Sequence, residues 1–360
     1  MVSSRIGMFV CLVLAAVSVR GQVYWSSTEP DCGNLWEVSY PNPTGGGGTV
    51  YSCAVGGTFL WLAAGGAWGT SLRVSAPATN AVGVEYWFYD TNGQELSLDS
   101  TVGTGSSVSS GSTVTFALNA NQPSQINLLG TTGTNYGNTQ TGSAYAEFYC
   151  PDEVTCANIL PQLIYSALPT VPWSLSVPIS WDVTEMYPIG WATAWSAVGV
   201  DNGGLRRVSI AVYNQNAVDS SSSPTPSTYA VRVYDQNGNL AGAGTTPPLA
   251  PILLDSDGYA ITDGGTWGAL LSCSSGCPLT TPLPSGPFKV VVDGGSSYCS
   301  VEVLQVNGTS ATTLQVGFEG SGAANIGTAG TTGANALQKT HSRVTGRPRQ
   351  PHGAFAPLPR

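Results

Sequence analysis

Histidine is nearly missing from this chain of 360 residues. Its only two histidines, His341 and His352, lie close to the C-terminus. The remainder therefore has no imidazole for a Ser-His-Asp or Cys-His arrangement, nor for a His-liganded metal. A G-x-x-x-x-G-K-[ST] phosphate loop is also missing. These absences exclude most hydrolase and oxidoreductase mechanisms.

Charged side chains are scarce and unevenly distributed. They make up 9% of the sequence, and all 21 acidic residues lie between Glu29 and Glu319, where only five basic residues occur. This body has a net charge of −16, whereas the tail that follows carries five basic residues and no acid. An acidic body repels phosphate backbones, so we exclude nucleic acid as its partner. We expect a disordered basic tail over residues 322–360.

Long hydrophobic runs are limited to one segment near the N-terminus. Arg5, the apolar run Ile6–Val17 and the stretch "VRGQ" have the order of a secretory signal peptide. We predict residues 1–21 as this signal. No other segment reaches the roughly 20 apolar residues of a transmembrane helix. The sequence therefore predicts a secreted, extracellular or cell-surface protein without membrane insertion.

The cysteines fit an oxidising compartment. Seven remain after residue 21, and the local pairs Cys32 with Cys53 and Cys150 with Cys156 are the simplest disulfides. Cys299 lies in the strand-like "YCSVEVLQV", and either Cys273 or Cys277 of "CSSGC" could reach it. We select Cys273 with Cys299 as the third predicted pair, which leaves one thiol over.

Alternating apolar residues dominate the chain and predict an all-β protein. Val84, Tyr86 and Phe88 alternate with polar and aromatic residues in "VEYWFYD". The same period of two occurs in "STVTFALN", "RRVSIAVYN", "FKVVVDGG" and "TTLQVGFEG", with Gly-rich and Ser-rich turns between them. The one helix candidate is "TCANILPQLIYSAL", which Pro161 interrupts. We interpret that stretch as the connection between two domains.

A short echo suggests that the fold is built twice. "FYDTNG" at residues 88–93 returns as "VYDQNG" at 233–238, in each case after a strand led by Trp68 or Trp195. Asn-Gly between alternating strands favours a type I′ hairpin turn. We predict two tandem β-sandwich domains, at residues 22–155 and 156–321.

This pattern resembles the tandem Ig-like β-sandwich modules of secreted bacterial proteins. The resemblance covers roughly residues 68–150 and 191–319 and implies an Ig-like or jelly-roll-type fold in an extracellular or surface setting. It further implies a role in adhesion, assembly or display, with the chain itself as one candidate partner. It brings no functional residue with it.

A tryptophan cluster offers a binding hypothesis. Carbohydrate-binding sandwiches stack sugar faces on flat aromatic rings, with carboxylates accepting hydroxyl hydrogen bonds. Candidate glycan ligands are Trp173, Trp181, Asp182, Trp191 and Trp195. The alternative is that these rings fill the core, which large aromatics often do.

Calcium is the one cofactor that the sequence leaves open. "LDSDGYAITDGG" supplies Asp255, Asp257 and Asp263 as oxygen ligands for a Ca²⁺ site of low affinity. The repeated Asp-x-Asn-Gly turns also begin like oxygen-ligand loops but lack the closing acid.

Three functional classes follow. A non-enzymatic structural or adhesive protein stands first, and a carbohydrate-binding protein stands second. A glycoside hydrolase stands third, because that chemistry needs only two carboxylates at a suitable separation. The sequence offers carboxylates for it without pairing them: Glu85, Glu95, Glu147, Asp182 and Glu185.

Overall fold

The computed structural model is built almost entirely of strands. It describes residues 26–33, 35–41, 48–66, 68–103, 107–131, 136–167, 174–181, 193–201, 206–256, 260–271, 278–280, 283, 286–307, 310–314 and 316–318. The predicted signal peptide and basic tail lie outside these residues. No helix within them has the length and apolar character needed to cross a membrane. The expected all-β class is confirmed.

Residues 26–181, called the first half below, form two antiparallel sheets. Sheet A has the order β1 (Trp36–Pro41), β2 (Thr49–Ala64), β9 (Gln140–Cys150), β4 (Val82–Asp90) and β7 (Thr113–Leu118), and β12 (Ser180–Trp181) also pairs with β2. Sheet B has the order β11 (Ser174–Pro178), β10 (Gln162–Ala167), β3 (Trp68–Ser75), β8 (Pro123–Gly130), β5 (Leu98–Val102) and β6 (Ser109–Gly111).

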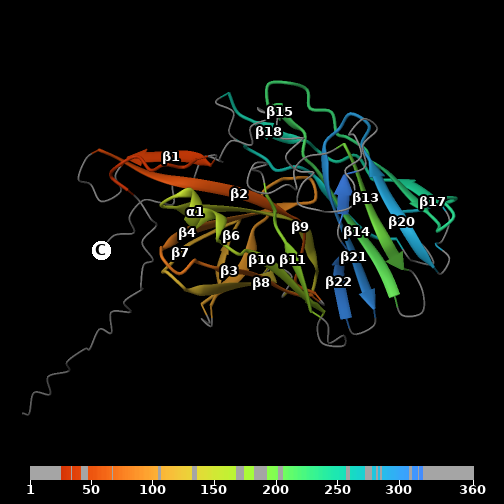
Figure 1. Ribbon diagram of the computed structural model, residues 1–360, viewed down its shortest axis with the longest axis horizontal. Helices are drawn as coiled ribbons and strands as arrows, with labels where there is room; N and C mark the ends of the chain where they lie inside the picture. The colour runs from red at the N-terminus through yellow and green to blue at the C-terminus, as the bar shows by residue number, and fades with distance from the viewer. Residues whose placement is uncertain are drawn as a thin grey trace, which may run out of the picture.

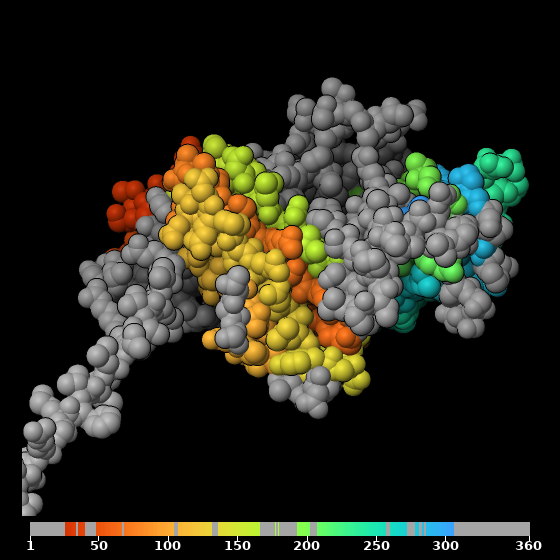
Figure 2. Space-filling model, turned by 90° about the horizontal axis from the view of Figure 1, so that it is seen from below, coloured from red at the N-terminus to blue at the C-terminus, as the bar shows by residue number. Residues whose placement is uncertain are grey.

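Residues 193–318, the second half, form two further sheets. Sheet C has the order β19 (Thr266–Leu270), β14 (Arg206–Asn214), β21 (Cys299–Asn307) and β22 (Ser310–Leu314). Sheet D has the order β17 (Leu240–Thr245), β16 (Ala230–Tyr234), β20 (Pro287–Asp293), β13 (Ala194–Asp201) and β23 (Val316–Phe318). A parallel pair, β15 (Ala217–Asp219) and β18 (Ile252–Leu254), lies beside them. The two halves lie side by side (Figures 1 and 2).

Each half encloses its own hydrophobic core between two sheets. Val84, Tyr86 and Phe88 of β4 face the first core, as their alternation predicts, together with side chains of β3 and β8. Ile210 and Val212 of β14 face the second core in the same way. The period of two thus decides which side chains enter each core.

Sheet A is buried on its outer face as well, which the alternation does not predict. Glu85, Trp87 and Tyr89 of β4 point away from the first core, yet all three are almost completely buried. On the adjacent strand β9, Tyr145 and Glu147 are buried on the same face. Sheet A is therefore an inner layer of the molecule rather than a surface layer.

The two halves repeat one strand order. In sheets B and D, the order β10-β3-β8-β5 corresponds to β23-β13-β20-β16. In sheets A and C, the order β2-β9-β4-β7 corresponds to β22-β21-β14-β19. Seven of these eight strand pairs also follow the same order along the chain. The eighth pair, β2 and β22, has the same position in the sheet, but β2 lies near the start of the first half and β22 near the end of the second. All of these pairings are antiparallel.

The helix candidate at residues 155–168 is helical only at its start, and residues 162–167 form a strand instead. Helix α1 (Glu153–Ala157) is a single turn, in which the Asp152 side chain accepts a hydrogen bond from the Thr155 amide. After Pro161, strand β10 pairs with β3 and places Leu163 and Tyr165 in the first core. Strands β10 and β11 thus extend sheet B, and β12 extends sheet A.

The two echoed turns share one backbone structure. In each, the glycine amide donates to the aspartate carbonyl, and the aspartate carboxylate accepts two backbone amides across the turn. The bonds are Gly93 to Asp90 (3.0 Å), Asn92 and Gln94 to the Asp90 carboxylate, Gly238 to Asp235 (3.0 Å), and Asn237 and Asn239 to the Asp235 carboxylate. The prediction of hairpin turns is confirmed.

The predicted turn type is wrong. A type I′ turn needs positive φ at the asparagine and the glycine. Gly93 and Gly238 have φ of +77° and +80°, but the only described non-glycine residues with positive φ are Asn121 and Tyr136. The turns have instead the pattern of three-residue loops that end in a glycine bulge. Moreover, they follow β4 and β16, which are not corresponding strands in the repeated order.

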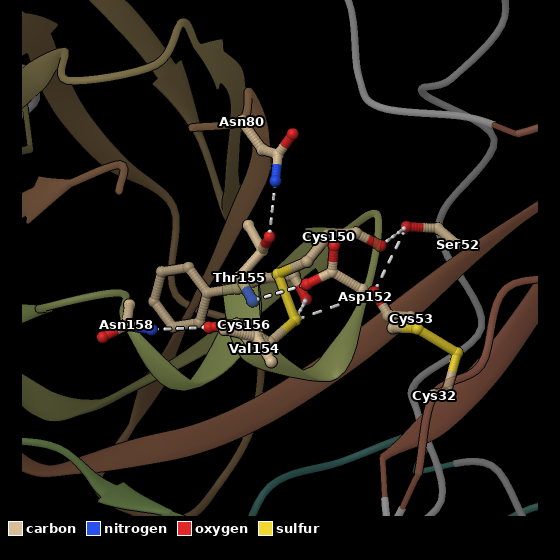
Figure 3. The surroundings of a disulfide bond; sticks show 11 residues. Cys32, Ser52, Cys53, Asn80, Cys150, Asp152, Val154, Thr155, Cys156 and Asn158 are labelled. Carbon is tan, nitrogen blue, oxygen red and sulfur yellow. Dashed lines mark hydrogen bonds between the residues drawn. A yellow bond between two sulfur atoms is a disulfide. The ribbon is translucent and has the colours of Figure 1, made fainter. Parts of the chain in front are cut away.

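Two predicted disulfides are confirmed. Cys32 bonds to Cys53 and Cys150 bonds to Cys156 (Figure 3). Cys53 and Cys150 lie directly opposite each other on β2 and β9. The two disulfides therefore attach the segments of Cys32 and Cys156 to adjacent positions of sheet A. Each is expected to contribute a few kcal/mol. Cys299 is buried in the second core, while Cys273 and Cys277 lie outside the described residues.

The echoed glycines provide a matched pair of substitutions. Gly238→Ala is expected to lower the free energy of unfolding by about 1 kcal/mol, because alanine resists positive φ. A Cβ at Gly93 would in addition lie 2.0 Å from the carbonyl oxygen of Asp263. Gly93→Ala is therefore expected to cost about 3 kcal/mol or more. Urea unfolding of both variants measures the difference, and equal losses would contradict the packing of this turn.

Candidate functional site

The predicted glycan-binding residues are only partly described. Trp195 is 2% exposed, faces the second core, and donates a hydrogen bond from Nε1 to the carbonyl oxygen of Cys299 (2.6 Å). It does not offer a ring face to a sugar. The backbone of Trp181 pairs with Gly57 in sheet A, and its side chain is not described. The other three residues, Trp173, Asp182 and Trp191, lie outside the described residues.

The predicted calcium ligands do not converge within the described residues. Asp263 is fully buried, and its two carboxylate oxygens accept hydrogen bonds from the hydroxyls of Tyr213 (2.5 Å) and Ser143 (3.0 Å). Asp255 is partly exposed and Asp257 is not described. Within the described part of the chain, no group of three or more His, Cys, Asp or Glu side chains could hold a metal ion.

Two of the carboxylates left unpaired by the sequence are brought together. Glu85 of β4 and Glu147 of β9 are directly opposite each other in the antiparallel register of sheet A. Cβ atoms of such pairs lie about 4.5–5.5 Å apart, and their side chains share a face. Both residues are 0% exposed. We regard this carboxyl pair as the candidate site.

The electrostatics of the pair favour a retained proton. Burial raises the pKa of Glu85 to about 7, although hydrogen bonds from the hydroxyls of Thr115 (3.3 Å) and Tyr149 (3.4 Å) act in the opposite direction. Like charges directly opposite on neighbouring strands also repel. At least one proton is therefore expected to stay in this pair close to neutral pH.

Aromatic rings surround the pair on the same face. Trp87 and Tyr145, also opposite each other, have ring centroids 5.7 Å apart. The indole Nε1 of Trp87 is buried and has no hydrogen-bond partner. Tyr149 completes this aromatic surface and donates to Glu85. The face thus combines two carboxyls with ring surfaces.

This arrangement has one element of glycoside hydrolysis and lacks another. Retaining glycosidases place two carboxyl groups about 5–5.5 Å apart on either side of the scissile bond. A directly opposed pair of glutamates suits such a separation, but complete burial leaves a sugar no path to it in this conformation. Glu95, another candidate, is exposed and accepts a hydrogen bond from Ser112. Asp182 and Glu185 lie outside the described residues.

Sequence reasoning missed Tyr213 and Ser143 as hydrogen-bond partners of Asp263, and it missed Glu302 as a buried carboxyl group. Glu302 on β21 lies opposite Ala211 of β14, on the strand that corresponds to β9 in the repeated order, where Glu147 lies opposite Glu85. A sequence signal did exist, because both glutamates interrupt an apolar strand in "AYAEFYC" and "SVEVLQV". Their burial depends on what packs against the outer face of the sheet. The alternation of apolar residues along a strand does not predict that packing.

Comparisons with protein-family models, curated proteins and solved structures found no match to this chain.

The raised pKa of Glu85 predicts a pH-dependent stability. A carboxyl whose folded pKa lies above its unfolded value stabilises the fold fully below the unfolded value, and this stabilisation is lost as the pH rises. From about pH 4.5 to about pH 7, the free energy of unfolding should therefore decrease. Glu85→Gln, which stays neutral, is expected to be about 2 kcal/mol more stable than the wild type at about pH 8 and similar to it at about pH 4.5.

Urea unfolding across this pH range provides the measurement. Glu95→Gln is the matched control, because Glu95 is exposed in the connection that follows β4, the strand of Glu85. If the free energy of unfolding of Glu85→Gln depended on pH as that of the wild type does, the retained proton in the carboxyl pair would be contradicted.

Proposed function

We propose that this chain is a secreted structural protein whose two β-sandwich modules resemble Ig-like modules and serve adhesion or assembly outside the cell. In this proposal residues 1–21 direct export, and the protein itself or an extracellular glycan is the partner. The two disulfides fit an oxidising extracellular compartment.

One observation carries the proposal: the two halves repeat one strand order and are joined through buried contacts. The strands of sheets A and B recur in sheets C and D in corresponding positions. Backbone and side-chain hydrogen bonds cross between the halves, including Ser143 to Asp263 and Thr266 to the carbonyl of Leu60. Repeated modules joined by a buried contact suit extension and display outside the cell.

Strand pairing supports one placement of the module limits. We place the end of the first module after β12, because β10 and β11 extend sheet B and β12 extends sheet A. The second module then covers the strands from β13 to β23. This division keeps each core within one module.

The assembly role is tested with the secreted protein lacking residues 1–21. Light scattering after size exclusion and negative-stain microscopy are expected to show defined oligomers or filaments at micromolar concentration. A monomer that binds polysaccharides in a tryptophan fluorescence titration would instead support the carbohydrate-binding alternative. Release of reducing sugar that Glu85→Gln abolishes would overturn the proposal in favour of a carboxylate-based glycoside hydrolase.

A further inference from the structure

The contact between the two halves, called the junction, has a polar and an apolar part. Its residues are Leu60, Trp61, Thr91, Gly93, Ser143 and Tyr165 of the first half, and Ala211, Tyr213, Asp263, Thr266, Gly268, Glu302 and Leu304 of the second half.

The first echoed turn docks on the second half through its backbone. The amides of Asp263 and Thr266 donate to the carbonyls of Gly93 (2.9 Å) and Thr91 (3.1 Å). No side chain could replace the hydrogen of Gly93 without meeting the Asp263 carbonyl. The second echoed turn has no such neighbour, since a Cβ at Gly238 would meet nothing within 4 Å. The first turn is thus part of the junction.

The apolar part of the junction covers the outer face of sheet C. Leu60 packs with Ala211 and Tyr213, while a Cβ at Gly268 would lie 2.8 Å from the ring of Trp61. Leu304 of β21 packs against the first core. Sheet C, like sheet A, is therefore buried on both faces.

Two carboxyl groups of the second half are enclosed in this contact. Asp263 accepts hydrogen bonds from Ser143 across the junction and from Tyr213 within its own half. Burial raises the pKa of Asp263 to about 6. Glu302 is 8% exposed, and its Oε1 has no hydrogen-bond partner. Burial raises the pKa of Glu302 to about 8.

The titratable groups that contact these carboxyls in the described part of the chain are tyrosines. Tyr165 of β10 faces Glu302. Burial, and to a lesser extent the charge of Glu302, raises the pKa of Tyr165 well above its usual value. Tyr213 of β14 donates to Asp263, and Asp90 belongs to the docked turn.

We propose that the junction is a proton-controlled contact, closed when Asp263 and Glu302 are protonated and loosened when both become negatively charged. The geometry supports this directly: both carboxyls belong to one half, face the other half, and are shielded from water by the docked surfaces. Ionisation places two negative charges in a contact that is shielded from water, and the lost hydration makes this costly. Separation of the halves would hydrate both.

The direction of the effect follows from the folded and unfolded states of the acids. Each of these pKa values is raised in the closed junction, so the closed form binds more protons than the open form at intermediate pH. Closure is therefore favoured in acid and lost as the pH rises through about 6 and then about 8. This inference concerns a single chain and does not rest on the proposed assembly role.

Hydrogen exchange of the disulfide-bonded protein tests the proposal. Peptides covering residues 87–96 and 260–271 report the junction amides, and those covering 229–234 and 287–293 report sheet D. After correction for intrinsic exchange, junction protection should fall at least about tenfold between about pH 5 and about pH 8, because one released proton changes the opening equilibrium up to tenfold per pH unit. Protection in sheet D should change much less.

A double substitution separates protonation from other effects of pH. Asp263→Asn combined with Glu302→Gln keeps the shapes of the protonated acids, so junction protection should no longer depend on pH. Asp219→Asn, at an exposed acid, should leave the pH dependence intact. Equal junction protection in the wild type at both pH values, or a double variant that still loosens, would overturn the proposal. The wild-type series decides the matter even if the double variant does not fold.

Discussion

Burial of both faces of sheets A and C is the constraint on which the rest of the structure depends. One face of each sheet closes a core, and the other face is enclosed as well. Carboxyl groups on the enclosed faces, Glu85, Glu147 and Glu302, lose the water that would stabilise their charge. A protein whose body is strongly acidic thus keeps several acids where their neutral form is favoured. Packing and protonation are coupled in this fold.

Both halves enclose acids, and two of these acids lie on corresponding strands. Glu147 and Glu302 lie on β9 and β21, and the residues opposite them are Glu85 in the first half and Ala211 in the second. The first half therefore encloses two directly opposed acids, whereas the second encloses Asp263 and Glu302 against the neighbouring half. The echoed Asp-x-Asn-Gly turns are a different matter, since they end strands that do not correspond. One became a docking element and the other stayed exposed.

Local patterns predicted what depends on nearby residues. The alternation in β4 and β14 identified the core-facing side chains, and short cysteine spacings identified two disulfides. Features that depend on distant partners were missed. The opposition of Glu85 and Glu147 depends on the register of β4 with β9, and Gln162–Ala167 became a strand because β3 and β11 pair with it. Trp195 belongs to the second core because sheet C covers it.

Buried acids of this protein are expected to hold their protons far above the pH at which exposed acids lose them. Infrared titration of the carboxyl C=O stretch, with ¹³C-labelled glutamate, measures protonation directly. A protonated glutamate signal is expected to persist at about pH 6 in the wild type, where ordinary glutamates are ionised, and Glu85→Gln and Glu302→Gln are each expected to diminish it. Loss of the whole protonated signal by about pH 6 would show that these acids titrate as exposed ones do.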